Sequence, residues 1–174
     1  KTFYKNYYSP DKASIVAVGN LSKKNMVETL DFIGQWQGNA YEFADYSDFP
    51  QYNKNQIFLI DSPEAVQSVV YIVDRSLPFD ATGDHFKSRL MNFPLGGAFN
   101  SRINLNLRED KGFTYGANSG FVGGKTLGWF EVSTDLTAAN TGEGIKEILG
   151  EIERYRSEGV EKAEIDFMRN AFTL

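Results

Sequence analysis

The sequence contains no cysteine and only one histidine, and these two scarcities exclude several kinds of site. Without cysteine there are no disulfides and no thiolate metal ligands. A catalytic zinc site needs about three protein ligands, usually with two histidines among them, so His85 cannot build one by itself. No G-x-S-x-G pattern is present, which disfavours a Ser-His-acid triad. We therefore expect no metal and no other cofactor in this chain.

Positive charge and long apolar runs are also scarce. The chain has 18 basic and 23 acidic residues, a formal net charge of −5, which argues against nucleic acid and anionic membranes as partners. No apolar run approaches the ~20 residues of a membrane-spanning helix. With 174 residues, 41% of them hydrophobic, the chain is long enough for a packed core. The compartment is left open, with the bacterial periplasm or another extracytoplasmic compartment as our expectation.

The apolar pattern predicts one domain over residues 1–174, of the α+β class. We expect strands at 14–19, 56–61, 66–73, 115–122 and 129–135. We expect helices near 1–8, after Ser22, after Thr82, between Gly97 and Gly112, between Asn140 and Gly159, and at the end of the chain. Hairpin-connected strands mixed with helix pairs predict a mostly antiparallel β-sheet with helices packed on one face. Because the sequence stops inside an expected helix, we expect a piece of a longer polypeptide.

The most informative stretch runs from Leu95 to Tyr115. Two glycines precede an expected helix that ends at Gly112, and a strand follows at once. Arg108 lies near the end of that helix and Tyr115 begins the strand, so both side chains can point into one cleft and polarise a peptide carbonyl. The alternative is that Arg108 is an exposed cation favoured by the helix dipole and that Tyr115 packs on the core. From the spacing alone, both interpretations stay open.

Residues 93–115, FPLGGAFNSRINLNLREDKGFTY, closely resemble a motif of the insulinase/pitrilysin family of zinc metallopeptidases, which includes the mitochondrial processing peptidase. The C-terminal-type domain of that family carries L-G-G-x-F-x-S-R-[LI] followed by L-R-E-x-x-G-[LF]-x-Y, and nearly every position matches. Residues 8–20, 65–71 and 159–165 resemble further segments of the same domain, with Lys12 where the family usually has asparagine. The resemblance thus covers nearly the whole chain.

The resemblance implies a processing-peptidase-like half that completes a chamber for unfolded peptide. Zinc and its H-x-x-E-H motif would belong to a homologous N-terminal-type domain, on the same chain or on a separate subunit. Tyr115 would donate its hydroxyl to the scissile carbonyl and its oxyanion, and Arg108 would orient the substrate backbone or support the tyrosine. The parent would then be a zinc-dependent endopeptidase, and this chain alone would be inactive. The alternative is a non-catalytic scaffold or peptide-holding subunit of the same family.

Overall fold

The computed structural model describes residues 2–38 and 52–173. The chain divides into two compact units, Lys1–Asp48 and Phe49–Leu174, and each is described by itself. The prediction of a single domain over residues 1–174 stays a prediction. Residues 37–55 lack the periodicity of a helix or a strand, which predicts a long connection. Most of them lie outside the described residues.

The first unit is built from short helices. It contains α1 (Thr2–Tyr7), α2 (Lys23–Thr29) and two 3-10 turns, Pro10–Lys12 and Asp31–Gln35. Ser22 caps α2 as predicted, because its Oγ accepts a hydrogen bond of 3.1 Å from the backbone N–H of Asn25.

The strand predicted at 14–19 is wrong. This segment of the first unit has no strand pairing, and Val16 and Val18 are 86% and 96% exposed. A β-branched run favours extended backbone, but it becomes a strand only where a neighbour accepts its hydrogen bonds.

The second unit contains an antiparallel sheet of three strands in the order β1-β3-β2. Its strands are β1 (Gln67–Ser76), β2 (Ala117–Gly123) and β3 (Gly128–Thr137). Gln67 lies opposite Thr137 at one end of the β1–β3 pair. Alternate residues of the strands turn inward, as the period of two predicts, and Val132 and Leu136 of β3 are fully buried.

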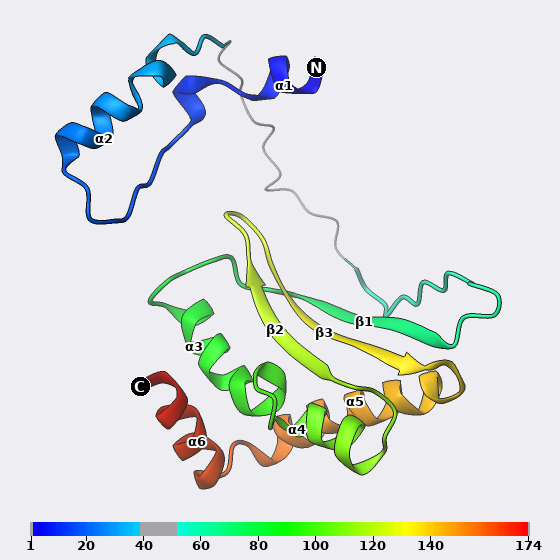
Figure 1. Ribbon diagram of the computed structural model, residues 1–174. Helices are drawn as coiled ribbons and strands as arrows, with labels where there is room; N and C mark the ends of the chain where they lie inside the picture. The colour runs from blue at the N-terminus through cyan, green and yellow to red at the C-terminus, as the bar shows by residue number, and fades with distance from the viewer. Residues whose placement is uncertain (1, 39–51, 174) are drawn as a thin grey trace. The chain divides into compact units, whose positions relative to one another are not determined.

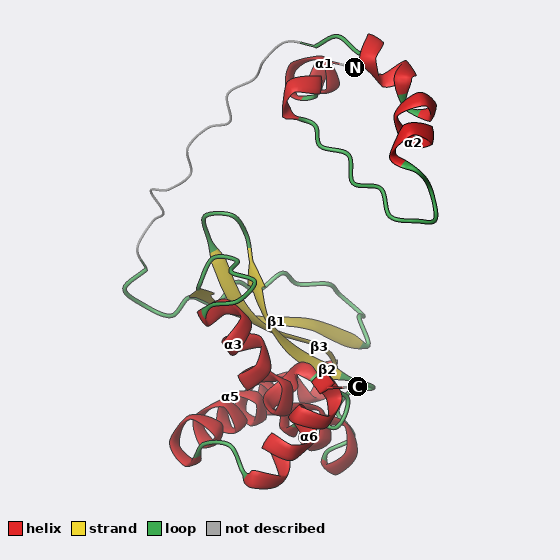
Figure 2. Cartoon of the chain, turned by 90° about the vertical axis from the view of Figure 1, so that its left-hand side faces the viewer, coloured by secondary structure: helices red, strands yellow, loops and turns green. Residues whose placement is uncertain are grey.

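All the helices of this unit lie on one side of the sheet, as Figures 1 and 2 show. They are α3 (Asp84–Asn92), the π-helical turn η3 (Phe93–Gly97), α4 (Arg102–Asn104), the π-helical turn η4 (Leu105–Asp110), the 3-10 turn η5 (Ala138–Asn140), α5 (Thr141–Glu158) and α6 (Lys162–Thr173). The helices pack on the sheet through Ile103, Leu107 and Ile148, and each of these side chains is fully buried. The α+β prediction is confirmed. No helix among residues 2–38 and 52–173 is long and apolar enough to cross a membrane.

A close approach of backbone and side chain joins η3 to β2. Asn92 donates a 2.7 Å hydrogen bond to the carbonyl of Ser119 and accepts one of 2.6 Å from its hydroxyl. Gly96 lies directly above: a Cβ on it would stand 2.1 Å from the Ser119 Oγ. Only glycine fits there, which gives the first glycine of the motif a structural reason.

A partly buried ion pair joins α4 to α6. Arg102 donates to both carboxylate oxygens of Glu164, at 2.5 and 2.7 Å, and to the carbonyl of Gly159 at 3.1 Å. The hydrogen bond from Arg102 holds the pKa of Glu164 below its ordinary value. The guanidinium also lies over the ring of Tyr155, 4.8 Å from its centroid. Arg102 therefore holds two helices together.

The strand predicted at 56–61 is also wrong. The segment has no strand pairing, and Ile57, Phe58, Leu59 and Ile60 are each at least 85% exposed. A turn follows this segment, in which the N–H of Ala65 donates to the carbonyl of Ser62 at 3.1 Å.

Candidate functional site

Arg108 and Tyr115 line the same cavity, which has a volume of about 360 Å³. The sequence placed them seven residues apart, and the turn after η4 brings both to this one space. The cavity is lined by Gln67, Arg108, Glu109, Gly112, Phe113, Thr114, Tyr115 and Thr137. It lies where the start of β1 and the end of β3 meet the segment between η4 and β2.

The turn η4, which carries Arg108, is tied to α5. The amide of Asn106 donates to Glu147 at 3.0 Å and to Glu151 at 2.7 Å, and Lys111 pairs with Glu147 at 2.7 Å. The bond from Lys111, followed by that from Asn106, lowers the pKa of Glu147. These contacts fix the backbone on both sides of Arg108.

A left-handed residue turns the chain from η4 toward the strand. Gly112 has φ of 65°, a conformation that glycine adopts without steric cost. The N–H of Phe113 then donates back to the carbonyl of Leu107 at 2.9 Å, while the Phe113 carbonyl accepts from Thr137 at 3.0 Å. The chain therefore reverses against the end of β3.

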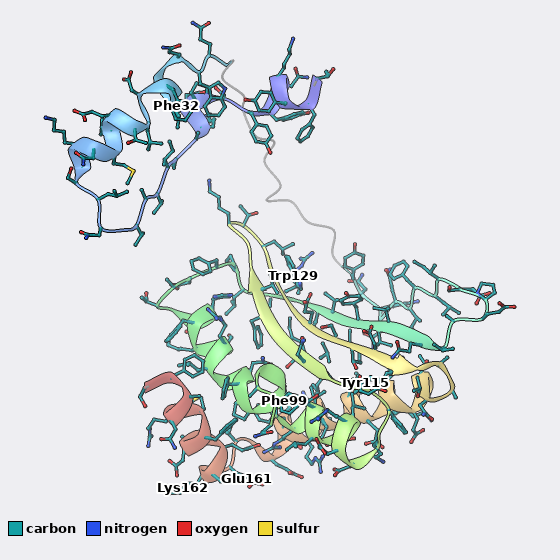
Figure 3. All side chains as sticks on the ribbon, in the orientation of Figure 1. Phe32, Phe99, Tyr115, Trp129, Glu161 and Lys162 are labelled. Atoms are coloured by element: carbon teal, nitrogen blue, oxygen red, sulfur yellow. The ribbon has the colours of Figure 1, made fainter. Side chains whose placement is uncertain are left out.

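The backbone around Tyr115 is held while its side chain is free. The hydroxyl of Thr114 donates to the carbonyl of Gly116 at 2.9 Å and accepts from its N–H at 3.1 Å. Thr134 of β3 adds bonds of 3.0 Å to that hydroxyl and that carbonyl. The tyrosine itself is 91% exposed, and Figure 3 labels it just before β2. Among the described residues, none forms a hydrogen bond with its phenol.

Two residues not singled out from the sequence contact the guanidinium of Arg108. Glu109 forms an ion pair with it, and Phe99 lies under it with the guanidinium carbon 4.4 Å from the ring centroid. Phe99 stands four residues before Ile103, a spacing that favours one shared helix face, but α4 begins only at Arg102 and Phe99 is 64% exposed. No local pattern pairs these two residues, because Phe99 precedes the helical segment that carries Arg108.

Gln67 and Thr137 were also missed as cavity residues. They are paired across β1 and β3 and lie far from Arg108 in sequence. Only the strand register brings them to the cavity, and no local pattern reveals it. Both residues add neutral hydrogen-bonding groups to the lining of the cavity that Arg108 and Tyr115 share.

The described residues do not fit a zinc ion. Within 2–38 and 52–173, no three side chains of histidine, cysteine, aspartate or glutamate gather closely enough to hold a metal. His85 of α3 is buried near Gly123, at the end of β2 away from Tyr115, and its Nε2 has no hydrogen-bond partner among these residues. The cavity therefore offers a cation, a carboxylate, a phenol and amide or hydroxyl groups, which can bind the polar backbone of a peptide.

The second unit is thus a two-layer domain, an antiparallel sheet with helices on one side, and the cavity lies at one end of it. The chain belongs to the family described as "Peptidase M16 inactive domain", whose model matches residues 1–172. The resemblance to the insulinase-like C-terminal-type domain is thereby confirmed. No curated protein is significantly similar to the chain in sequence.

Solved structures share the fold at low sequence identity. A protease from Helicobacter pylori has a TM-score of 0.72 and 18% identity over 98% of this chain and 42% of that one. A conserved protein from Enterococcus faecalis V583 has a TM-score of 0.60 and 17% identity over 88% and 35%. The peptidase M16 inactive domain from Pseudomonas fluorescens has a TM-score of 0.57 and 23% identity over 62% and 26%. The chain thus spans less than half the length of each of these proteins.

Proposed function

We propose that this chain is the substrate-chamber half of a zinc-dependent endopeptidase, which holds unfolded peptide and presents Arg108 and Tyr115 to its scissile carbonyl. The zinc and its ligands would reside in a homologous N-terminal-type domain, on the same chain or on another subunit. The observation that carries the proposal is the convergence of a guanidinium and an exposed phenol on one cavity of this unit.

The chemistry of the two side chains supports this division of labour. A neutral phenol donates one hydrogen bond, and a preorganised donor aimed at a developing oxyanion is worth about 3–4 kcal/mol of barrier, or about 10²–10³ in rate. Tyr115 has a free hydroxyl among the described residues, and its backbone is held by Thr114 and Gly116. Arg108 has a guanidinium plane set by Phe99, suited to a peptide carbonyl.

A second function, a non-catalytic peptide-holding subunit, is favoured by two observations. The family is described as an inactive domain, and Arg108 already has a partner in Glu109. In that function the cavity binds backbone groups of an extended chain, and Tyr115 contributes contact area without a role in turnover.

The experiment that separates the two functions replaces Tyr115 with phenylalanine in the parent protein that contains the partner domain. We expect turnover of an unstructured peptide to fall by about 10²–10³ with KM and bound zinc little changed, because only the oxyanion donor is lost. Tyr52→Phe is the matched control, since Tyr52 is exposed and lies outside the cavity lining. Turnover within about twofold of the parent, with peptide affinity reduced, would leave only the holding function.

Arg108→Lys provides a second measurement on the same preparation. Lysine keeps the charge and loses the planar fork that reads a carbonyl or carboxylate. We expect KM to rise about tenfold with a smaller change in kcat if Arg108 orients substrate. An unchanged KM would assign Arg108 to the surface ion pair alone.

A further inference from the structure

Strand β1 has an outer edge that no described residue occupies. In the order β1-β3-β2, it is a terminal strand. The N–H of Ala138 donates to the carbonyl of Val66 at 3.0 Å, which continues the β1–β3 register one step beyond the pair Gln67 and Thr137. Because hydrogen-bonding groups alternate along an antiparallel strand, even-numbered residues of β1 face β3, and the N–H and C=O groups of Gln67, Val69 and Tyr71 face outward.

The segment just before β1 has the properties of a missing strand. Residues 56–61 read Gln-Ile-Phe-Leu-Ile-Asp, which is rich in residues that favour strands. In the second unit this segment lies in the open: Ile57 is 95% exposed, Phe58 85%, Leu59 88% and Ile60 92%. Four adjacent apolar side chains in water are unfavourable, and burying them requires a surface within reach.

The connection between this segment and β1 is a tight turn of the right length. The Ala65 N–H bonds to the Ser62 carbonyl, so Pro63 and Glu64 are the two central residues. Proline fixes φ near about −65°, and Glu64 has φ of 66°. That combination is a type II turn, whose twist does not match that of paired strands and which favours glycine at its second central position. The turn therefore reverses the chain, and the arm before it is not paired with β1 in the structure.

We propose that Gln56–Asp61 closes onto the outer edge of β1 as a fourth strand. Extending the Ser62–Ala65 hydrogen-bonded pair along both arms makes Ile60–Gln67, Phe58–Val69 and Gln56–Tyr71 the next hydrogen-bonded pairs. These β1 residues are the ones whose backbone groups point outward. The turn predicts that Gln67, Val69 and Tyr71 bond to the arm, and the β1–β3 register predicts independently that their backbone groups face outward.

In the closed arm, Ile57 and Phe58 would lie beside apolar residues on opposite faces of the sheet. Ile57 would lie opposite Val70, which is only 8% exposed and faces the helices. Phe58 would lie opposite Val69, which is 68% exposed on the open face of the sheet. Closure covers the edge that would otherwise pair with other extended chains. It also brings Ile60 beside Gln67, one wall of the cavity, whether or not the proposed peptidase function holds.

Paired cysteines test the register, and the absence of natural cysteine makes the result unambiguous. Leu59 and Ser68 would form a non-hydrogen-bonded pair, whose Cα separation suits a disulfide. We expect the Leu59→Cys/Ser68→Cys variant to form an intramolecular disulfide about tenfold faster than Phe58→Cys/Ser68→Cys, because a one-residue slip puts the sulfurs on opposite faces. Equal rates for the two variants would overturn the proposal, and so would disulfides formed only between copies.

Amide hydrogen exchange tests closure without cysteine. We expect the amides of Val69 and Tyr71 in the unaltered chain to exchange more slowly than exposed amides. Replacing Pro63 and Glu64 with Asn-Gly, which favours a type I′ turn, should slow them about tenfold more. Exchange at the solvent-exposed rate in both proteins would refute closure. Protection that appears only with added peptide or at raised protein concentration would assign the edge to another chain and refute it as well.

Discussion

Replacement of Gly96 by alanine tests the contact that seats η3 on β2. The new Cβ would stand 2.1 Å from the Oγ of Ser119 and 2.8 Å from its backbone N. Moving the hydroxyl breaks its 2.6 Å bond to Asn92, which is 3% exposed, and leaves a buried acceptor unpaired at about 1–3 kcal/mol. The backbone N cannot rotate away, and such overpacking adds about 1–3 kcal/mol.

The expected loss for Gly96→Ala is therefore about 2–6 kcal/mol in the free energy of unfolding, or roughly 4–24 °C in Tm for a chain of this size. Urea unfolding and thermal melts followed by circular dichroism measure it. Gly120→Ala on the same strand is the control, because nothing lies within 4 Å of its added Cβ. The control should stay within about 0.5 kcal/mol of the parent. If the two variants are equally stable, the close packing of η3 on β2 is refuted.

Two further substitutions test the interior. Hydrogen bonding from Arg102 depresses the pKa of Glu164 below its ordinary 4.5, so the stability this group adds is present above pH 4.5 and is lost as the pH falls through the lower folded-state pKa. Glu164→Gln should therefore lower stability by about 1–3 kcal/mol at neutral pH and flatten the acid side of a Tm-against-pH curve, and an unchanged acid side would contradict the ion pair. Leu107 is fully buried, and Leu107→Ala should lose about 2–5 kcal/mol in urea unfolding. A loss under about 1 kcal/mol would mean that the core closes around the gap.

The sheet and its helices follow from local pattern where partners lie close in sequence. Strands β2 and β3 form a hairpin, and their alternation of apolar and polar residues already specifies which face is buried. The segments 14–19 and 56–61 have strand-forming composition as well, yet neither is paired with another strand in the structure. A strand is completed by its neighbour, and composition cannot show whether a neighbour is within reach.

The candidate site was predictable only in part for the same reason. Gly112, three residues before Tyr115, indicated the chain reversal that brings Arg108 and Tyr115 to one cavity. Gln67 and Thr137 reach that cavity through strand register, a property of the whole sheet. The stack of Phe99 on Arg108 depended on where α4 begins, and helix ends are the least predictable feature of a sequence.

The two principal side chains of the cavity differ in how they are prepared for a ligand. Arg108 rests on Phe99 and pairs with Glu109, whose side chain is 54% exposed, and an exposed ion pair is worth only about 0–1 kcal/mol. In the proposed function, a peptide carbonyl oxygen would therefore displace Glu109 at little cost, while Phe99 stays in contact with the guanidinium. Tyr115 has a fixed backbone and an exposed ring with no hydrogen-bond partner among the described residues. In the proposed function, a peptide that enters the cavity would therefore also order the side chain of Tyr115.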